Sequence, residues 1–160
     1  MNQVSTPFAT EHTLPEVNKV APEVAASCMC TLTRQFSRLV TRAYDNALQT
    51  FGITGSQFML LCQLAQQDGI TAVEIGRAFD IEKSTLSRNL KRLLALQLLT
   101  IDPPTGRRGR GLHLTSTGGV VITQAFPAWQ AVQSRAVVAL GTGTRTALES
   151  LISRAGTLVD

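Results

Sequence analysis

Apolar residues recur at helical spacing over most of the chain. Between residues 24 and 51 they fall on one side of a helix, and that side consists of Leu32, Phe36, Leu39, Val40, Ala43, Ala47 and Leu48. Residues 116–140 form a second long apolar stretch around Pro127, and the last segment repeats Leu148, Leu151, Ile152, Ala155 and Val159. Spacings of three and four residues predict amphipathic helices. The helices at both ends of the chain therefore carry apolar faces that a second copy could cover.

Three shorter helices are predicted between the long ones. "TGSQ", which begins at Thr54, and "TAVE", which begins at Thr71, are capping boxes that open two of them. The second of these ends near Phe79, "DI" forms a turn, and "KSTLSRNLKRL" at residues 83–93 forms the next helix. A short helix, a tight turn and a second helix stand in the order of a helix-turn-helix.

The helix at residues 83–93 has two chemically different sides. Its apolar side holds Leu86, Leu90, Leu93 and the following Leu94. The opposite side carries Ser84, Ser87, Arg88 and Lys91, with Lys83, Thr85 and Arg92 at its edges. This side offers hydrogen-bond donors and positive charge without an acid, which suits the major groove of DNA, and the planar guanidinium of Arg88 matches guanine. A solvated helix face is the alternative interpretation.

A β-hairpin is predicted directly after this helix. Leu99–Ile101 and Leu112–Leu114 are short β-prone runs, and the loop between them is rich in Pro and Gly. This loop carries Arg107, Arg108 and Arg110. A basic hairpin after a helix-turn-helix is typical of a wing, which reaches phosphates or the minor groove. Alternatively, the arginines only keep an exposed loop soluble.

Composition and charge narrow the class of protein. The 160 residues are 44% hydrophobic and 16% charged, against roughly 25% charged in typical soluble domains, so apolar surface is left for a partner. The net charge is +4. Residues 83–110 hold seven of the fifteen Lys and Arg and only Asp102 of the eleven acids, a net +6. The basic charge is concentrated where the helix-turn-helix and the wing are predicted, which indicates an acidic partner.

Several other classes are not supported. Residues 1–23, with Pro7, Pro15 and Pro22, are expected to form an irregular arm without the features of a signal peptide. No apolar run reaches the roughly 18 residues of a membrane span, so a cytoplasmic protein is expected, and its three cysteines predict no disulfide framework. His12 and His113 stand without an acid–base grouping, and neither a phosphate loop nor metal-ligand spacing is present. We therefore expect no enzyme, no metal and no cofactor.

The sequence resembles the multiple-antibiotic-resistance regulator (MarR) family of bacterial winged-helix repressors. The resemblance covers residues 24–160 and is carried by "STLSRNLKRL" and by the end of the wing, "LHLTSTG". It implies a mainly α protein with a small β-hairpin wing, in which a winged helix-turn-helix module at residues 53–115 lies between dimerisation helices at 24–52 and 116–160. It also implies a homodimer that binds a pseudo-palindromic double-stranded DNA operator.

The resemblance assigns roles to residues as well. Ser84, Thr85, Ser87, Arg88 and Asn89 would lie in or beside the major groove, and Arg107, Arg108 and Arg110 would be wing contacts. Lys91 and Arg92 suit phosphates. Two positions depart from the family pattern: Gly106 replaces the usual Asp before the arginine pair, and Glu82 replaces an Asp as the helix cap, where it is expected to cap less well.

In the family, a small aromatic or phenolic effector or the oxidation of a cysteine lowers DNA affinity. Cys28 and Cys30, beside Arg34, Arg38 and Arg42, are the candidates for redox or ligand sensing, and thiols that only pack are the alternative. Cys62 is expected in the core. A non-enzymatic winged-helix protein that uses its basic face on an acidic protein partner remains the rival interpretation.

Overall fold

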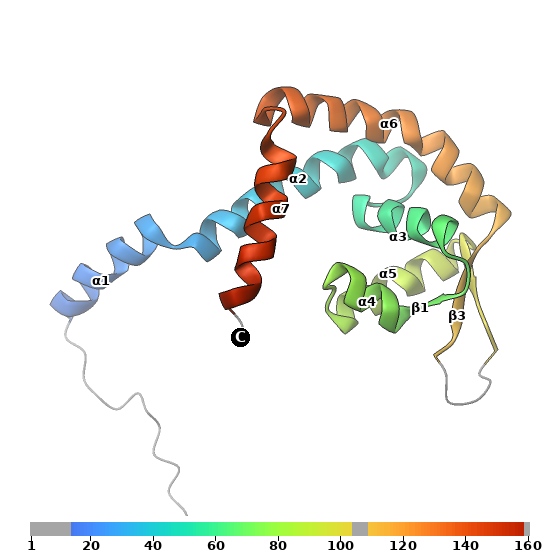
Figure 1. The fold of residues 1–160 in the computed structure, drawn as a ribbon, viewed down its shortest axis with the longest axis horizontal. Coiled ribbons are helices and arrows are strands. Elements are labelled where there is room, and N and C mark those ends of the chain that lie inside the picture. The colour runs from blue at the N-terminus through green and yellow to red at the C-terminus, as the bar shows by residue number, and fades with distance from the viewer. Residues whose placement is uncertain (1–13, 104–108, 159–160) are drawn as a thin grey trace, which may run out of the picture. The chain divides into compact units, whose positions relative to one another are not determined.

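The computed structural model of the chain describes residues 14–103 and 109–158, and the chain divides after Val40 into two units. The first unit contains helix α1 (Leu14–Ser27) and the beginning of helix α2 (Met29–Leu48), which continues into the second unit (Figure 1). Apolar side chains on these helices are more than half exposed at Val20, Val24, Met29 and Leu32. The first unit therefore presents apolar surface rather than a core of its own.

The predicted irregular arm at residues 1–23 is wrong from Leu14 onward. Residues 14–27 form α1, with Pro15 in its first turn and Pro22 inside it. Proline is tolerated in a first turn because the N–H groups there have no intrahelical acceptor. Pro22 removes one hydrogen bond, but the helix continues through the good helix formers that follow it.

The single helix predicted for residues 24–51 is also wrong, because it is interrupted and ends early. Cys28 lies between α1 and α2, and its carbonyl accepts hydrogen bonds from the amides of Thr31 (3.2 Å) and Leu32 (3.3 Å), so a new helical turn begins there. At the other end α2 passes into a 3₁₀ turn, η1 (Gln49–Phe51), which Gly52 closes at φ 72°. The left-handed conformation of Gly52 confirms the predicted turn.

The second unit holds the predicted helix-turn-helix and hairpin. After η1 its elements are α3 (Gly55–Gln66), β1 (Ile70–Thr71), α4 (Ala72–Phe79), α5 (Lys83–Ala95), β2 (Leu99–Ile101), β3 (Gly111–Leu114), α6 (Ser116–Leu140), α7 (Thr144–Ala155) and η2 (Gly156–Leu158). The capping boxes of Thr54 and Thr71 are both formed, as predicted. The architecture is mainly α with a small β-hairpin wing, and the predicted fold class is confirmed (Figure 1).

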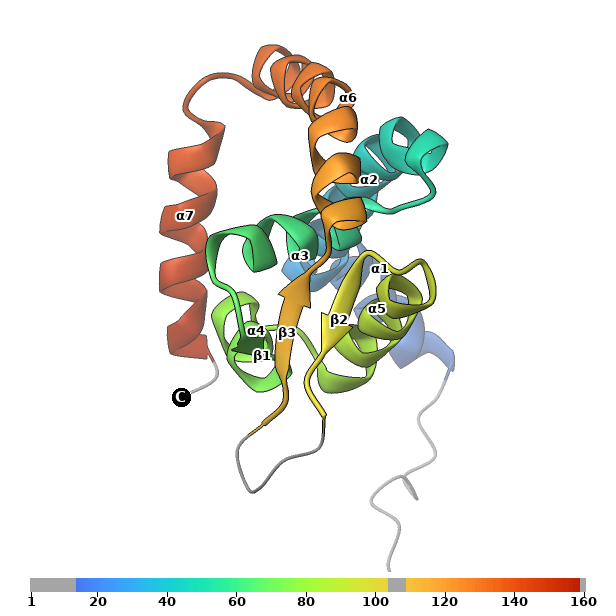
Figure 2. The same ribbon diagram turned by 90° about the vertical axis from the view of Figure 1, so that its right-hand side faces the viewer.

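The small sheet has one more strand than the sequence predicted. Its order is β1-β3-β2, and both pairs are antiparallel (Figure 2). Ile70 of β1 pairs with Leu112 of β3, and Leu99 and Thr100 of β2 pair with Leu114 and His113. The two-residue strand β1 therefore fastens the wing to the segment between α3 and α4.

One hydrophobic core joins the helix-turn-helix to the sheet. Helix α3 packs against α5, α6 and β3, and α4 packs against α5. The side chains that are fully buried in this core are Leu48, Leu60, Leu61, Leu64, Ile75, Leu93, Leu99 and Leu112. Each fully buried leucine contributes roughly 1.5–3 kcal/mol relative to an exposed one. Through this core, α5 and the hairpin are held on the same support.

Candidate nucleic-acid interface

The turn between α4 and α5 is fixed at both sides. Asp80 ends α4 in the left-handed conformation (φ 49°), and the amide of Ile81 donates to the carbonyl of Gly76 at 3.0 Å. Glu82 then caps α5, since its carboxylate accepts from the amides of Ser84 (2.7 Å) and Thr85 (3.1 Å) and from the Ser84 hydroxyl. These hydrogen bonds, the Ser84 hydroxyl first, lower the pKa of Glu82. Glu82 thus makes the hydrogen bonds of a helix N-cap residue.

Helix α5 has the two sides that the sequence predicted. Leu86, Leu90 and Leu93 are buried in the core. The residues whose side chains are exposed are Lys83, Ser84, Thr85, Ser87, Arg88, Lys91 and Arg92. Nη2 of Arg88 donates to the hydroxyl of Thr85 at 3.2 Å. This side presents donors and cations to solvent, which suits a ligand that carries phosphates and hydrogen-bond acceptors.

Asn89 does not lie with these exposed residues. It is half-buried, and its Oδ1 accepts a hydrogen bond from Nε2 of Gln57 in α3 at 3.3 Å. Gln57 is buried, and its Oε1 accepts from the amide of Thr54 at 3.1 Å within the capping box. The structure therefore places Asn89 against α3, where it positions α5. No sequence pattern indicated this contact, because thirty-two positions separate Gln57 from Asn89.

The wing is the antiparallel pair of β2 and β3 (Figure 2). Arg107 and Arg108, two of its three predicted contacts, lie outside the described residues. Arg110 is exposed, and its Nε donates to the backbone carbonyl of Asp102 at the end of β2. Asp102 also closes the ladder, since its amide donates to the carbonyl of Gly111 at 2.9 Å. Arg110 is thus tied to the root of the wing.

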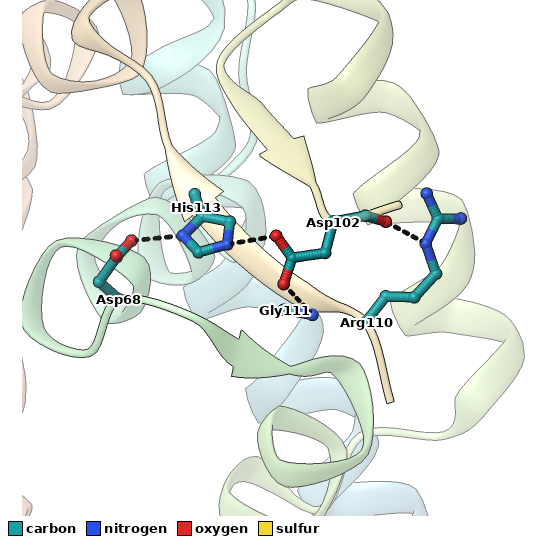
Figure 3. A network of polar contacts seen from close by, with 5 residues as sticks. All are labelled: Asp68, Asp102, Arg110, Gly111 and His113. Atoms are coloured by element: carbon teal, nitrogen blue, oxygen red, sulfur yellow. Dashed lines mark hydrogen bonds and ion pairs between the residues drawn. The ribbon is translucent and has the colours of Figure 1, made fainter. Parts of the chain in front are cut away.

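His113 lies between two carboxylates, which the sequence analysis did not foresee. Its Nδ1 is 2.9 Å from Oδ1 of Asp68, and its Nε2 is 3.0 Å from Oδ1 of Asp102 (Figure 3). The hydrogen bonds to Asp68 and then to Asp102 raise the pKa of His113. The prediction that His113 has no acid beside it is therefore wrong. Asp68 is far from His113 in sequence, and only the pairing of β1 with β3 brings the two together.

A cavity of about 640 Å³ opens between α4 and α5. Its apolar lining consists of Ala72, Val73, Gly76, Ile81, Leu86, Leu90, Leu94 and Ile101. Ser87 and the charged residues Arg77, Asp80, Lys83 and Lys91 also line it. An apolar cavity with a few polar groups is typical of a small-molecule site. Residues of the exposed side of α5 thus also border this cavity.

The cysteines differ in environment, and all three are free thiols. A hydrogen bond with the side chain of Thr31 is the main cause that lowers the pKa of Cys28. Cys30 is exposed, while Cys62 packs at the margin of the core, where burial raises its pKa. Arg34 and Arg38 are exposed on α2 and line an open hollow of about 460 Å³ with Thr33 and Ser37.

Within residues 14–103 and 109–158, no three His, Cys, Asp or Glu side chains are grouped so that they could hold a metal ion. None of the helices that the structure describes is long and apolar enough to cross a membrane.

A helix-turn-helix followed by a β-hairpin, with a basic exposed side on the second helix, defines a winged helix-turn-helix module. Residues 51–109 of this module match the model of the MarR family. This match supports the resemblance to the MarR family that the sequence motifs indicated.

Three known proteins illustrate the similarity. The HTH-type transcriptional repressor NicR of Pseudomonas putida is 24% identical over 131 residues, which are 77% of this chain and 83% of NicR. The multiple antibiotic resistance protein MarR of Salmonella typhimurium is 32% identical over 84 residues, which are 52% of this chain and 58% of that protein. The solved structure of the M. tuberculosis transcriptional regulator MosR in complex with DNA has a TM-score of 0.72 and 27% identity, and covers 82% of this chain and 98% of MosR.

Proposed function

We propose that the chain is a non-enzymatic transcriptional regulator that binds double-stranded DNA, with α5 in the major groove and the wing beside it. The observation that carries this proposal is the exposed side of α5, where hydroxyls and four cations lie opposite the buried leucines and the helix itself contains no acid. Arg88 is the candidate for a base contact, because its guanidinium can bind guanine with two hydrogen bonds. The complex of MosR with DNA supports the same use of this fold.

Fluorescence anisotropy with two duplexes tests the proposal. One duplex carries the intergenic DNA upstream of the gene, and the other is a shuffled sequence of the same composition. We expect tighter binding to the first, and an affinity that falls steeply with salt, since each neutralised phosphate contributes about −0.9 to the slope of log affinity against log salt. Equal or absent binding to upstream and other promoter fragments would contradict the proposal and favour an acidic protein as the partner.

We further propose a homodimer that represses transcription from a pseudo-palindromic operator. The predicted segments at 24–52 and 116–160 would form its dimerisation helices. Support comes from apolar side chains on α6 and α7 that are at least half exposed in the single chain, namely Val138, Leu151 and Ile152. The proposal of repression rests on the similarity to the repressor NicR. Sedimentation equilibrium should give twice the mass of the chain, and a reporter gene behind the operator should be expressed more strongly without the protein.

The cavity between α4 and α5 supports a small aromatic or phenolic effector as the signal for release. A molecule there would touch Leu86 and Leu90 from the side of α4 and would lie next to Ser87 and Lys91. Val73, 58% exposed, lines the cavity, whereas the similarly exposed Val120 (53%) does not. Val73→Trp should therefore abolish release of DNA by a panel of phenols and aromatic acids, and Val120→Trp should leave it unchanged.

Thiol oxidation is the second proposed signal. Cys28 has a lowered pKa and Cys30 is exposed, so both thiols are candidates for attack by peroxide. Peroxide should release DNA from the wild-type protein and not from the variant with Cys28→Ser and Cys30→Ser. Equal release from both would assign these thiols to packing.

A further inference from the structure

The root of the wing is closed around Asp102. Its Oδ2 accepts from the amide of Gly111 at 3.2 Å, its Oδ1 contacts His113, and its carbonyl accepts from Arg110. A side chain at Gly111 would bring its Cβ within 2.6 Å of Asp102 Oδ2, so the carboxylate fits against a residue that has none. Asp102 therefore makes the contacts with Arg110, Gly111 and His113 that hold the beginning of β3 against the end of β2 (Figure 3).

His113 connects Asp102 at the wing to the segment that precedes the helix-turn-helix. Asp68, its second carboxylate, belongs to the segment that joins α3 to β1, and the amide of the neighbouring Gly69 donates to the carbonyl of Leu112 at 3.0 Å. Within residues 14–103 and 109–158, no other charged side chain faces the imidazole from the packed elements: α3 contains no charged residue, β1 consists of Ile70 and Thr71, and the paired residue of β2 is Thr100. Asp68, His113 and Asp102 therefore form one hydrogen-bonded network, which connects the wing to the segment between α3 and β1.

Both contacts need a proton on each ring nitrogen. A carboxylate only accepts hydrogen bonds, and a neutral imidazole donates from one nitrogen alone. Only the imidazolium can donate to Asp68 and Asp102 together. Loss of its proton leaves a lone pair facing one of the carboxylates, and that contact becomes repulsive.

We propose that His113 is a positioning residue for DNA binding, whose imidazolium fastens the wing root at Asp102 to the helix-turn-helix at Asp68, so that DNA affinity falls when this proton is lost. The inference rests on the proposed DNA-binding function and deepens it. The direction follows from the pKa of His113, which is raised above 6.5 by its two carboxylates. The contacts are complete below pH 6.5 and are lost as the pH rises through the raised pKa.

The chain offers a clean spectroscopic test, because it has two histidines, His12 and His113. In a His12→Gln background, NMR titration of the one remaining imidazole reports the pKa of His113 directly. We expect this pKa to lie above 6.5 and to fall in Asp68→Asn and in Asp102→Asn. A pKa at or below 6.5 that neither substitution changes would overturn the proposal.

DNA affinity is measured in parallel, from pH 6.0 to 8.5 at constant salt and in the same background. We expect a fall of roughly five- to tenfold across this range, the effect of losing one solvent-accessible hydrogen bond of ordinary strength. His113→Gln should be flat over the range, because its side chain does not titrate. The same fall in His113→Gln would show that another group is responsible and would overturn the proposal.

Asp68→Asn separates positioning from a direct effect of charge on the phosphates. An amide at position 68 can donate to the neutral imidazole or accept from the charged one, so both contacts survive at every pH. Affinity in Asp68→Asn should then no longer follow the protonation of His113 measured by NMR, whereas a direct charge effect would still follow it. Glu23→Gln on α1 makes the same change of charge without a hydrogen bond to His113 and should keep the wild-type pH profile.

Failure of the proposed function would look different. If no duplex binds at any pH, DNA binding itself is refuted, and the NMR titration still decides whether the two carboxylates hold the proton. If DNA binds equally well from pH 6.0 to 8.5 while His113 titrates within that range, the proposed function stands and the positioning role of His113 is refuted.

Discussion

Gly118 gives the sharpest prediction of stability in this fold. It is buried in the first turn of α6, where its amide donates to the cap hydroxyl of Thr115 at 3.0 Å. A Cβ at this position would lie 2.2 Å from the carbonyl oxygen of Leu98 and 2.7 Å from Cδ1 of Leu114. The nearer atom belongs to the backbone and itself accepts from the amide of Thr115 at 3.2 Å. Gly118→Ala therefore forces the start of α6 away from the turn that precedes β2.

The size of the effect follows from three terms. Overpacking costs typically 1–3 kcal/mol, and loss of the hydrogen bond between Thr115 and Leu98 adds about 1 kcal/mol. Alanine regains up to about 1 kcal/mol over glycine in a helix. We expect Gly118→Ala to lower the free energy of unfolding by about 1–4 kcal/mol. A Cβ at the neighbouring Gly119 would meet no other described part of the protein within 4 Å, so Gly119→Ala should raise this free energy by about 0.5–1 kcal/mol.

Urea unfolding followed by far-ultraviolet circular dichroism measures both variants, at one protein concentration because a dimer would make the midpoint depend on it. The two alanines differ by one position and have the same intrinsic helix propensity. Equal stabilities for Gly118→Ala and Gly119→Ala would refute the argument, since the contacts with Leu98 and Leu114 distinguish the two positions.

Three further substitutions test other parts of the molecule. Arg88→Ala should weaken binding to the preferred duplex by roughly 1–3 kcal/mol and reduce the base preference at one position of each half-site. Arg145→Ala, which removes an arginine paired with Glu149 on α7, should keep the wild-type base preference. An equal loss of affinity by Arg88→Ala on shuffled DNA would indicate that Arg88 contacts a phosphate. Glu82→Ala should lower the melting temperature at neutral pH. Because the pKa of Glu82 is lowered, the difference in melting temperature from wild type should vanish as the pH falls through that pKa. A difference independent of pH would show that the charge of Glu82 does not stabilise the helix. Tyr44→Phe removes the 2.6 Å hydrogen bond to Gln133 and should cost about 0.5–1.5 kcal/mol in urea unfolding, whereas an unchanged midpoint would mean that water replaces this bond.

The features that were predictable from the sequence are those set by near neighbours. The boxes of Thr54 and Thr71 join residues three positions apart, and both are formed. Likewise, the leucines of α5 recur at the period of the helix, so their burial could be predicted from spacing alone. Neither kind of pattern requires knowledge of what packs where.

The errors near the N-terminus have a local cause that the pattern did not reveal. The interruption at Cys28 is marked by neither Gly nor Pro, while Pro22, which usually ends a helix, lies inside α1. Proline often ends a helix but does not always do so, and the loss of one hydrogen bond at Pro22 did not end α1. Boundaries at both positions were therefore wrong although the helical periodicity was right.

The remaining errors share another cause, because they depend on long-range contacts with α3 and its ends. Gln57, in the first turn of α3, holds Asn89 of α5, and Asp68, just after α3, holds His113 of the wing. Both contacts join residues that are more than thirty positions apart, and no periodicity encodes them. They have a common consequence: the two elements proposed to face DNA are each fastened by a polar contact to an opposite end of one helix. The distance between the reading helix and the wing is then set by α3, whose buried Leu60, Leu61 and Leu64 leave it little freedom to move.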